Sequence, residues 1–178
     1  MINMNKNIIT IPNIISSIRI KLVGIAAILL FNNNTTVAFV LYTIAILTDF
    51  LDGYLARKLN QVSELGKILD PLADKLLIGS IMLVLYLQTQ MPLWYVFIFA
   101  GCSLYNVLGA LLIRKRITFV LPSVMVGKVA AVLMMATCML NIIAPAFEYL
   151  LYCYIISALL LVISVARYTQ IAISKLKK

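Results

Sequence analysis

Residues 39–87 read FVLYTIAILTDFLDGYLARKLNQVSELGKILDPLADKLLIGSIMLVLYL, which is two long apolar runs separated by a charged stretch. Each run is close to the length of about 20 mostly apolar residues that a helix needs to cross the hydrocarbon core of a bilayer. The runs also lack the alternation of apolar and polar residues that is typical of strands. The stretch therefore predicts two membrane-spanning helices joined by a short polar connection.

The composition of the whole chain agrees with this prediction. Of its 178 residues, 63% are hydrophobic and 12% are charged, and the mean hydropathy is +1.06. Soluble domains contain about half apolar and about a quarter charged residues, so the composition argues against a water-soluble fold. The net charge of +9 would suggest nucleic acid in a soluble protein. In so apolar a chain it indicates membrane orientation and anionic partners instead, and no nucleic-acid partner is expected.

Six apolar segments of spanning length follow one another along the chain. They cover residues 12–31, 35–57, 67–89, 92–113, 121–144 and 146–171. No internal repeat or low-complexity linker separates them, so residues 1–178 are expected to form one membrane-embedded domain. The first residues, MINMNKNIITIPN, lack the pattern of a cleavable signal peptide, and the first helix is expected to remain in the mature protein. The predicted fold is all-α, an integral membrane protein with six transmembrane helices.

Lysine and arginine are distributed unevenly over the connections between these segments. The connections at 31–36, 88–92 and 141–148 contain neither residue type. The opposite side collects Lys6, Arg57, Lys58, Lys67, Arg114, Lys115, Arg116, Lys175, Lys177 and Lys178. By the positive-inside rule both termini are cytosolic, and the chain is expected to be a multi-pass protein of the cytoplasmic membrane.

Four aspartates lie on the hairpin formed by residues 39–87. Five of the six acidic residues of the chain lie within residues 48–75. Asp49 and Asp52 share one face of the first helix, at i and i+3, and Asp70 and Asp74 share one face of the next, at i and i+4. Because the connection is short, the two helices are expected to be antiparallel neighbours. The four carboxylates would then lie at similar depth, just inside the cytosolic boundary.

Four carboxylates inside a membrane need a compensating cation. Each costs about 2.5–3.5 kcal/mol at a helix centre, and like charges that face one another also repel. The chain has no histidine and no paired cysteines, which argues against zinc. An all-oxygen aspartate set suits Mg²⁺ or Mn²⁺, which bind carboxylates together with substrate phosphates. Beside it, Arg57 offers a cationic fork for phosphate, while Gly53, Ala56 and Gly66 leave the backbone open to close approach.

Two other interpretations of the hairpin are open. Interfacial helix ends with snorkelling charges and small packing residues would explain single residues, but not four aspartates on facing sides of one hairpin. A divalent-cation transporter is the more serious alternative, because intramembrane carboxylates also line ion paths. Against it, the cluster lies near one surface, and the other segments offer few further polar ligands for a pathway.

The hairpin resembles the signature of the CDP-alcohol phosphotransferases, with eight identities across 26 positions. The matching residues are Asp49, Asp52, Gly53, Ala56, Arg57, Gly66, Asp70 and Asp74. The resemblance implies a two-metal site held by the four aspartates. It places the cytidine diphosphate near Asp52, Gly53, Ala56, Arg57 and Gly66. It further implies that Asp74 is the catalytic base and that the protein is a homodimer.

Two further stretches bear on the acceptor alcohol. LGKILDPLADKLL (65–77) and IPNIISSIRI (11–20) resemble phosphatidylglycerophosphate synthases and the related cardiolipin synthases. The implied reaction transfers a phosphatidyl group from CDP-diacylglycerol to glycerol 3-phosphate and releases CMP. The glycerophosphate branch usually carries an Arg-Glu pair early in the fourth helix, where this chain reads GCSLYNVLG (101–109). The alternative is the same chemistry with another acceptor, phosphatidylglycerol or another polyol.

Four further cations are candidates for binding an anionic acceptor. Lys128 lies within the fifth segment and Arg167 within the sixth, and a charge inside a membrane needs a partner. Arg114 and Arg116 belong to a loop cluster that is explained more simply as a topology signal. A small phosphorylated alcohol would supply the negative charge that Lys128 and Arg167 lack near them in sequence.

The charge asymmetry generates a prediction about topology. A single cysteine placed in the 31–36 connection should be labelled by a membrane-impermeant reagent added to intact cells. One placed at 60–63 should be protected until the cells are opened, because that connection is cytosolic. The unsubstituted chain measures the background from the three native cysteines. Reversed labelling would put the aspartate hairpin on the outer face.

Overall fold

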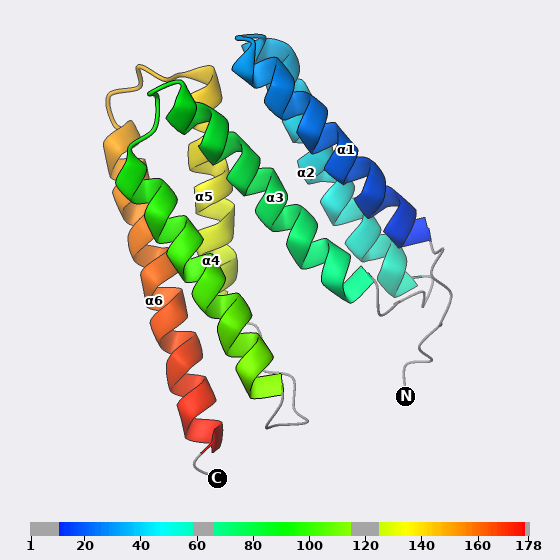
Figure 1. Ribbon diagram of the computed structural model, residues 1–178, viewed down its shortest axis with the longest axis vertical. Coiled ribbons are helices and arrows are strands. Elements are labelled where there is room, and N and C mark those ends of the chain that lie inside the picture. Colours follow the sequence, from blue (N-terminus) through cyan, green and yellow to red (C-terminus); the bar gives the residue numbers. More distant parts are fainter. Residues whose placement is uncertain (1–10, 59–65, 115–124, 177–178) are drawn as a thin grey trace. The chain divides into compact units, whose positions relative to one another are not determined.

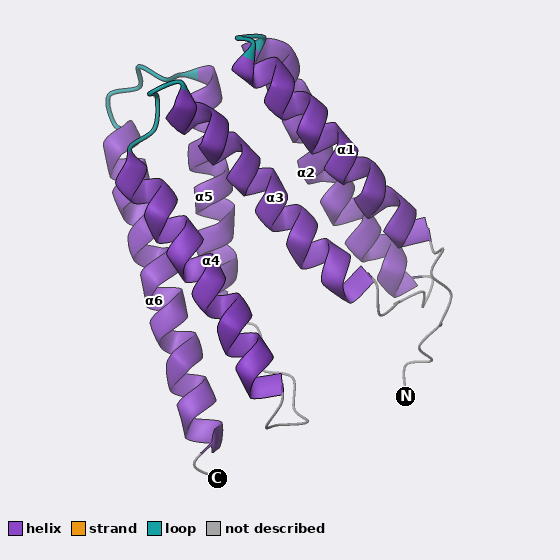
Figure 2. Cartoon of the chain, viewed as in Figure 1, coloured by secondary structure: helices purple, strands orange, loops and turns teal. Residues whose placement is uncertain are grey.

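The computed structural model describes the backbone of residues 11–58, 66–114 and 125–176, and side chains within 15–48, 73–109 and 125–174. In these ranges the chain forms six helices and no strand, which confirms the predicted all-α class (Figure 2). The helices are Ile11–Phe31 (α1), Thr35–Lys58 (α2), Gly66–Leu87 (α3), Leu93–Arg114 (α4), Met125–Ile143 (α5) and Leu150–Leu176 (α6).

The helix bounds follow the predicted segments closely, with the largest difference in the last helix. It was predicted over 146–171, but α6 begins at Leu150 and ends at Leu176. Two successive turns precede it, in which the N–H of Phe147 donates to Ala144 O at 3.1 Å and the N–H of Leu150 donates to Phe147 O at 3.0 Å. Pro145 is the second residue of the first of these turns, and a proline cannot continue the preceding helix.

The chain divides into two compact units, Met1–Gln88 and Thr89–Lys178. The first contains α1, α2 and α3, and the second contains α4, α5 and α6 (Figure 1).

In the first unit α1 packs against both α2 and α3. Small buried side chains, Ala26 on α1 and Ala38 and Ala45 on α2, let the backbones approach closely. A hydrogen bond of 3.2 Å between Tyr42 Oη and Ser80 Oγ joins α2 to α3. The start of α1, the end of α2 and the start of α3 lie at the same end of this unit (Figure 1). The helix α1 therefore runs alongside both helices that carry the aspartates.

The opposite end of the first unit is closed by hydrogen bonds to the last turn of α1. Asn33 has a positive φ of 62°. The N–H of Asn33 donates to Leu30 O at 3.0 Å and that of Asn34 donates to Leu29 O at 2.9 Å, the two bonds of a Schellman cap. The side-chain amide of Gln88, just beyond α3, donates to Leu30 O at 2.9 Å. This bond ties the end of α3 to the end of α1.

In the second unit α6 packs against both α4 and α5, and a buried polar network lies among the three helices. The Ser157 hydroxyl donates to Cys153 O at 2.7 Å, so Tyr95 is the donor in its 2.8 Å bond to Ser157 Oγ. The Asn141 amide donates to Tyr154 Oη and, at 3.2 Å, to Gln90 O. Paired in this way, the polar groups avoid much of the cost of burial in apolar surroundings.

Within the described residues, two stretches are long and apolar enough to cross a membrane, Met125–Ile143 and Leu150–Ser174. Shorter apolar stretches cover Thr35–Thr48 and Leu93–Gly109. Large apolar side chains also lie on the surface, among them Phe97, which is 65% exposed, and Ile28, which is 64% exposed. Extended apolar surface of this kind indicates contact with lipid or with another protein.

Candidate active site

The described part of the candidate site centres on Asp74. Asp74 lies in the third turn of α3, and its side chain is 55% exposed. One carboxylate oxygen, Oδ1, lies 3.4 Å from Nη1 of Arg19, whose side chain is 0% exposed. The separation is long for a hydrogen bond but within the range of an ion pair. The pair therefore joins a fully buried cation on α1 to a half-open carboxylate on α3.

The buried face of α1 explains why Arg19 points inward. Ser16, Arg19, Val23, Ala26 and Leu30 are all buried, and their spacing alternates between three and four residues. That spacing places them along one stripe of a helix. The other buried residues of this stripe have apolar or small side chains, and Arg19 is its one charged member. Its charge is consequently buried where α1 packs against its neighbours.

On α3, Asp74 directly follows Ala73, which belongs to the buried stripe of that helix. Ala73, Leu77 and Ile81 are 2% exposed or less, and they follow one another at i, i+4 and i+8. Asp74 is next to this stripe, so its side chain is turned partly out of the packed face. The carboxylate can therefore contact Arg19 while much of its surface stays open.

The remaining signature residues lie on the predicted helices, but their side chains are outside the described residues. They are Asp49, Asp52, Gly53, Ala56 and Arg57 on α2, and Gly66 and Asp70 on α3. Both helices are continuous through these positions, so the backbone has the i, i+3 and i, i+4 spacings expected from the sequence. That the four carboxylates meet stays a prediction.

Asp74 is the only one of the four proposed metal ligands whose side chain the structure describes. Among the side chains described, no three histidine, cysteine or acidic residues are grouped so that they could hold a metal ion. The donor chemistry nevertheless fits a hard divalent cation, because Asp74 offers a half-exposed carboxylate and its partners in sequence offer only further carboxylates.

The proposed acceptor cations Lys128 and Arg167 lie on two helices that pack together, α5 and α6. Both are exposed, and neither forms an ion pair with any side chain in the described ranges. Lys128 follows Gly127, at which an added Cβ would lie 2.7 Å from Ser164 Oγ. Arg167 is one turn beyond Ser164. Each cation therefore lies within one turn of the close contact between α5 and α6.

The structure describes less of the two loop cations, Arg114 and Arg116. Arg114 is the last residue of α4, with its side chain outside the described residues, and Arg116 lies outside them altogether.

Arg19 was missed by the sequence analysis, although a signal for it was present. It is a lone cation in the apolar run IPNIISSIRI, well inside the first predicted span. An ionisable residue within such a span is by default a candidate for function. Arg19 meets this criterion as well as Lys128 and Arg167 do. Its partner, Asp74, is 55 residues away and could not be identified from spacing.

Comparison with known proteins establishes the class to which these features belong. The family model for CDP-alcohol phosphatidyltransferases matches residues 9–170. The chain belongs to this family, and the resemblance drawn from the aspartate hairpin is confirmed.

Individual relatives refine this result. A CDP-diacylglycerol--glycerol-3-phosphate 3-phosphatidyltransferase of Rickettsia typhi is 40% identical over 78 residues, or 42% of this chain and 44% of the relative. The Bacillus subtilis protein of the same name is 40% identical over 90 residues, or 51% and 46%. A probable cardiolipin synthase (CMP-forming) of Drosophila melanogaster is 29% identical over 162 residues, or 82% and 50%. The chain thus spans about half of these relatives' length or less.

The contact between Gly127 and Ser164 generates a prediction about stability. Alanine usually favours a helix over glycine by about 0.5–1 kcal/mol. Gly24→Ala, on α1 with nothing within 4 Å of the added Cβ, should therefore hold or raise the melting temperature. Gly127→Ala should melt below Gly24→Ala, by about 2–4 °C for each kcal/mol lost. Adding Ser164→Ala should restore it, since only the Oγ is too close; equal melting of all three variants would contradict the close approach.

Proposed function

We propose that this protein transfers a phosphatidyl group from CDP-diacylglycerol to glycerol 3-phosphate, releasing CMP and forming phosphatidylglycerophosphate. The observation that carries the proposal is family membership over residues 9–170 together with the complete aspartate signature within that region. The acceptor is proposed from the activity for which the bacterial relatives are named, and these relatives are 40% identical in the aligned part.

One set of signature residues is proposed to bind the nucleotide part of CDP-diacylglycerol. Asp52, Gly53, Ala56, Arg57 and Gly66 would hold the cytidine diphosphate, with the Arg57 fork on its phosphates.

Asp49, Asp52, Asp70 and Asp74 would hold Mg²⁺ or Mn²⁺ in a two-metal site. When bound, such ions would neutralise charge on the pyrophosphate and favour its displacement.

Asp74 is proposed as the base. The acceptor hydroxyl gives its proton to the Asp74 carboxylate, and its oxygen forms a bond to the phosphorus that carries the diacylglycerol. The bond from that phosphorus to CMP breaks, and CMP leaves with the electron pair. The exposed part of Asp74 gives an incoming hydroxyl access to the carboxylate. With no histidine in the chain, a carboxylate is the natural proton acceptor.

The setting proposed for this reaction is the cytoplasmic membrane, with six spans, cytosolic termini and the aspartates at the cytosolic face. The two membrane-length apolar stretches and the exposed apolar side chains support insertion in a bilayer. The family match extends over both compact units, which supports one catalytic domain over 1–178. A homodimer is proposed from the family resemblance.

Phosphatidylglycerol is the second candidate acceptor. The probable cardiolipin synthase of Drosophila melanogaster aligns with 82% of this chain, which is more than the bacterial relatives cover. The segment GCSLYNVLG (101–109) also lacks the Arg-Glu pair of the glycerophosphate branch. A divalent-cation transporter is disfavoured because the chain belongs to a family of transferases.

The deciding experiment supplies purified protein with labelled CDP-diacylglycerol and Mg²⁺, and with one acceptor at a time. Glycerol 3-phosphate should release CMP and yield labelled phosphatidylglycerophosphate, whereas glycerol should not. CMP release with phosphatidylglycerol alone would place the chain with the cardiolipin synthases. Absence of CMP release with every acceptor and either metal would overturn the proposal.

The proposed division of labour among the aspartates gives a prediction. Asn keeps the size of Asp74 and one of its oxygens but is not a base. Since general-base contributions are about 10²–10⁴-fold, Asp74→Asn should lower kcat by that order while CDP-lipid binding with Mg²⁺ changes little. Asp49→Asn is the comparison, because it should weaken metal and CDP-lipid binding. If titration shows that both variants lose binding equally, Asp74 is a metal ligand and not the base.

The two exposed cations of α5 and α6 give another prediction. If Lys128 and Arg167 bind the acceptor phosphate, Lys128→Ala or Arg167→Ala should raise the acceptor KM more than the CDP-lipid KM. A lost charge-assisted bond of about 1.5–3 kcal/mol corresponds to roughly 10–150-fold in acceptor KM. Lys21→Ala is a matched control, since Lys21 is an exposed cation of α1. Equal changes in both KM values would contradict the assignment.

A further inference from the structure

Arg19 presents an electrostatic problem that its helix does not solve. Its side chain has no exposed surface, and it lies in a helix whose other buried residues are apolar or small. A buried guanidinium remains charged, so it requires negative charge close by. Asp74 Oδ1, at 3.4 Å, provides such a charge from α3. The burial of Arg19 is therefore linked to the residue proposed above as the catalytic base.

The two members of the pair differ sharply in access. The Arg19 side chain is 0% exposed and that of Asp74 is 55% exposed. A substrate can consequently reach the carboxylate but has no open path to the guanidinium. Asp74 is the half-exposed group through which the buried Arg19 can influence a bound substrate. In this respect Arg19 differs from Lys128 and Arg167, which are themselves exposed.

Arg19 is also placed where it can orient its partner. It lies between Ser16 and Val23 in the buried stripe of α1, and α1 packs against α2 as well as α3. Guanidinium is planar and presents its donors in a fixed fork, whereas the ammonium of lysine is a point charge on a flexible stem. A fork fixed on α1 restrains the direction in which the Asp74 carboxylate can point.

We propose that Arg19 is a positioning residue for the phosphatidyl transfer, an inference that rests on the proposed function. Contact with Oδ1 holds the Asp74 carboxylate in one orientation and leaves its exposed part to receive the proton of the acceptor hydroxyl. Loss of Arg19 removes the restraint and the neighbouring positive charge together. Because only the reacting geometry suffers, the effect should fall on kcat and not on CDP-lipid binding.

Two other roles for Arg19 lead to different results. If the pair only clamped α1 to α3, removing it would lower stability without changing the activity of the protein that remains folded. If Arg19 moved out to bind a substrate phosphate directly, its loss would raise the KM or the dissociation constant of that substrate. The experiment below separates both roles from positioning.

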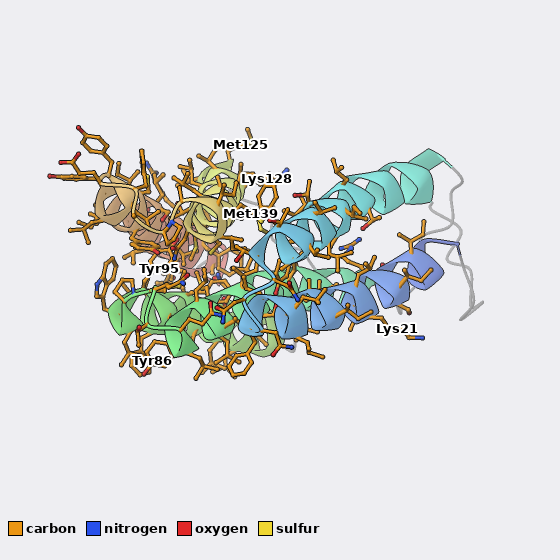
Figure 3. The ribbon with its side chains drawn as sticks, turned by 90° about the horizontal axis from the view of Figure 1, so that it is seen from above. Lys21, Tyr86, Tyr95, Met125, Lys128 and Met139 are labelled. Atoms are coloured by element: carbon orange, nitrogen blue, oxygen red, sulfur yellow. The ribbon has the colours of Figure 1, made fainter. Side chains whose placement is uncertain are left out.

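The test compares Arg19→Gln, Arg19→Lys and the unsubstituted full-length protein, purified in the same detergent. Lys21→Gln is the matched control, since Lys21 lies two residues along α1 and points away from the helix (Figure 3). The measurements are kcat, the KM of each substrate, CDP-lipid binding by titration, and the melting temperature.

Arg19→Gln should lower kcat by about 10–100-fold, the cost expected of a misplaced catalytic group. The dissociation constant of the CDP-lipid should change by no more than about threefold. Loss of a direct contact worth about 1.4 kcal/mol would change it tenfold. Arg19→Lys should recover part of kcat, because it restores the charge without the fork, and Lys21→Gln should match the unsubstituted protein. Unchanged kcat in Arg19→Gln, or a parallel loss of CDP-lipid binding, overturns the proposal. If Arg19→Gln yields no folded protein, the same comparison of kcat and binding is made on Arg19→Lys.

A double-mutant cycle with Asp74→Asn provides an independent measurement. If Arg19 acts through Asp74, adding Arg19→Gln to Asp74→Asn should cost no further single-turnover rate, and the two losses should not multiply. The melting temperature should show the same coupling, since removing both charges leaves neither one unpaired. Multiplying losses would show that Arg19 acts elsewhere and would overturn the proposal.

Failure of the function and failure of this inference are distinguishable. If the unsubstituted protein releases no CMP with any acceptor, the proposed function has failed, and the melting cycle still reports whether the two residues are coupled. If the unsubstituted protein is active but Arg19→Gln is equally active, only the positioning role has failed.

Discussion

The arrangement of the first unit depends on the burial of a guanidinium that stays charged. Arg19 has no exposed surface, and the carboxylate of Asp74 lies 3.4 Å from it on another helix. A buried charge without a partner would cost several kcal/mol, so α1 and α3 are held in a register that keeps the two groups together. In the same unit, the buried alanines at 26, 38 and 45 let α1 and α2 approach closely.

This pairing connects the fold of the first unit to its proposed chemistry. The aspartate signature lies on α2 and α3, while α1, which carries none of it, supplies the buried cation. A carboxylate proposed to accept a proton needs a fixed direction as well as access, and the pair offers both. One oxygen of the Asp74 carboxylate contacts Arg19, and the exposed part of the side chain is accessible to the proposed substrate.

In the second unit, polar contacts serve a different purpose. The bonds among Tyr95, Ser157, Asn141 and Tyr154 pair the buried hydroxyl groups and the Asn141 NH2 group, and they involve no charged side chain. They are internal to packed helices, whereas Lys128 and Arg167 are exposed and unpaired among the described side chains. The buried polar contacts of this unit therefore stabilise its helix packing. Its exposed cations are the groups proposed to bind an anionic acceptor.

The sequence by itself determined the all-α class, the number of helices in the described ranges, and the family. Helix length and apolar composition are local properties of the chain. The signature is likewise a set of identities within 26 residues, so it can be recognised without the tertiary structure. The start of α6 was misplaced because the two turns after Ala144 form through hydrogen bonds that composition does not reveal. Only the tertiary structure decided the partner of Asp74. Arg19 lies 55 residues away, and the periodicity of a helix fixes which face a residue occupies but not which helix will pack against that face.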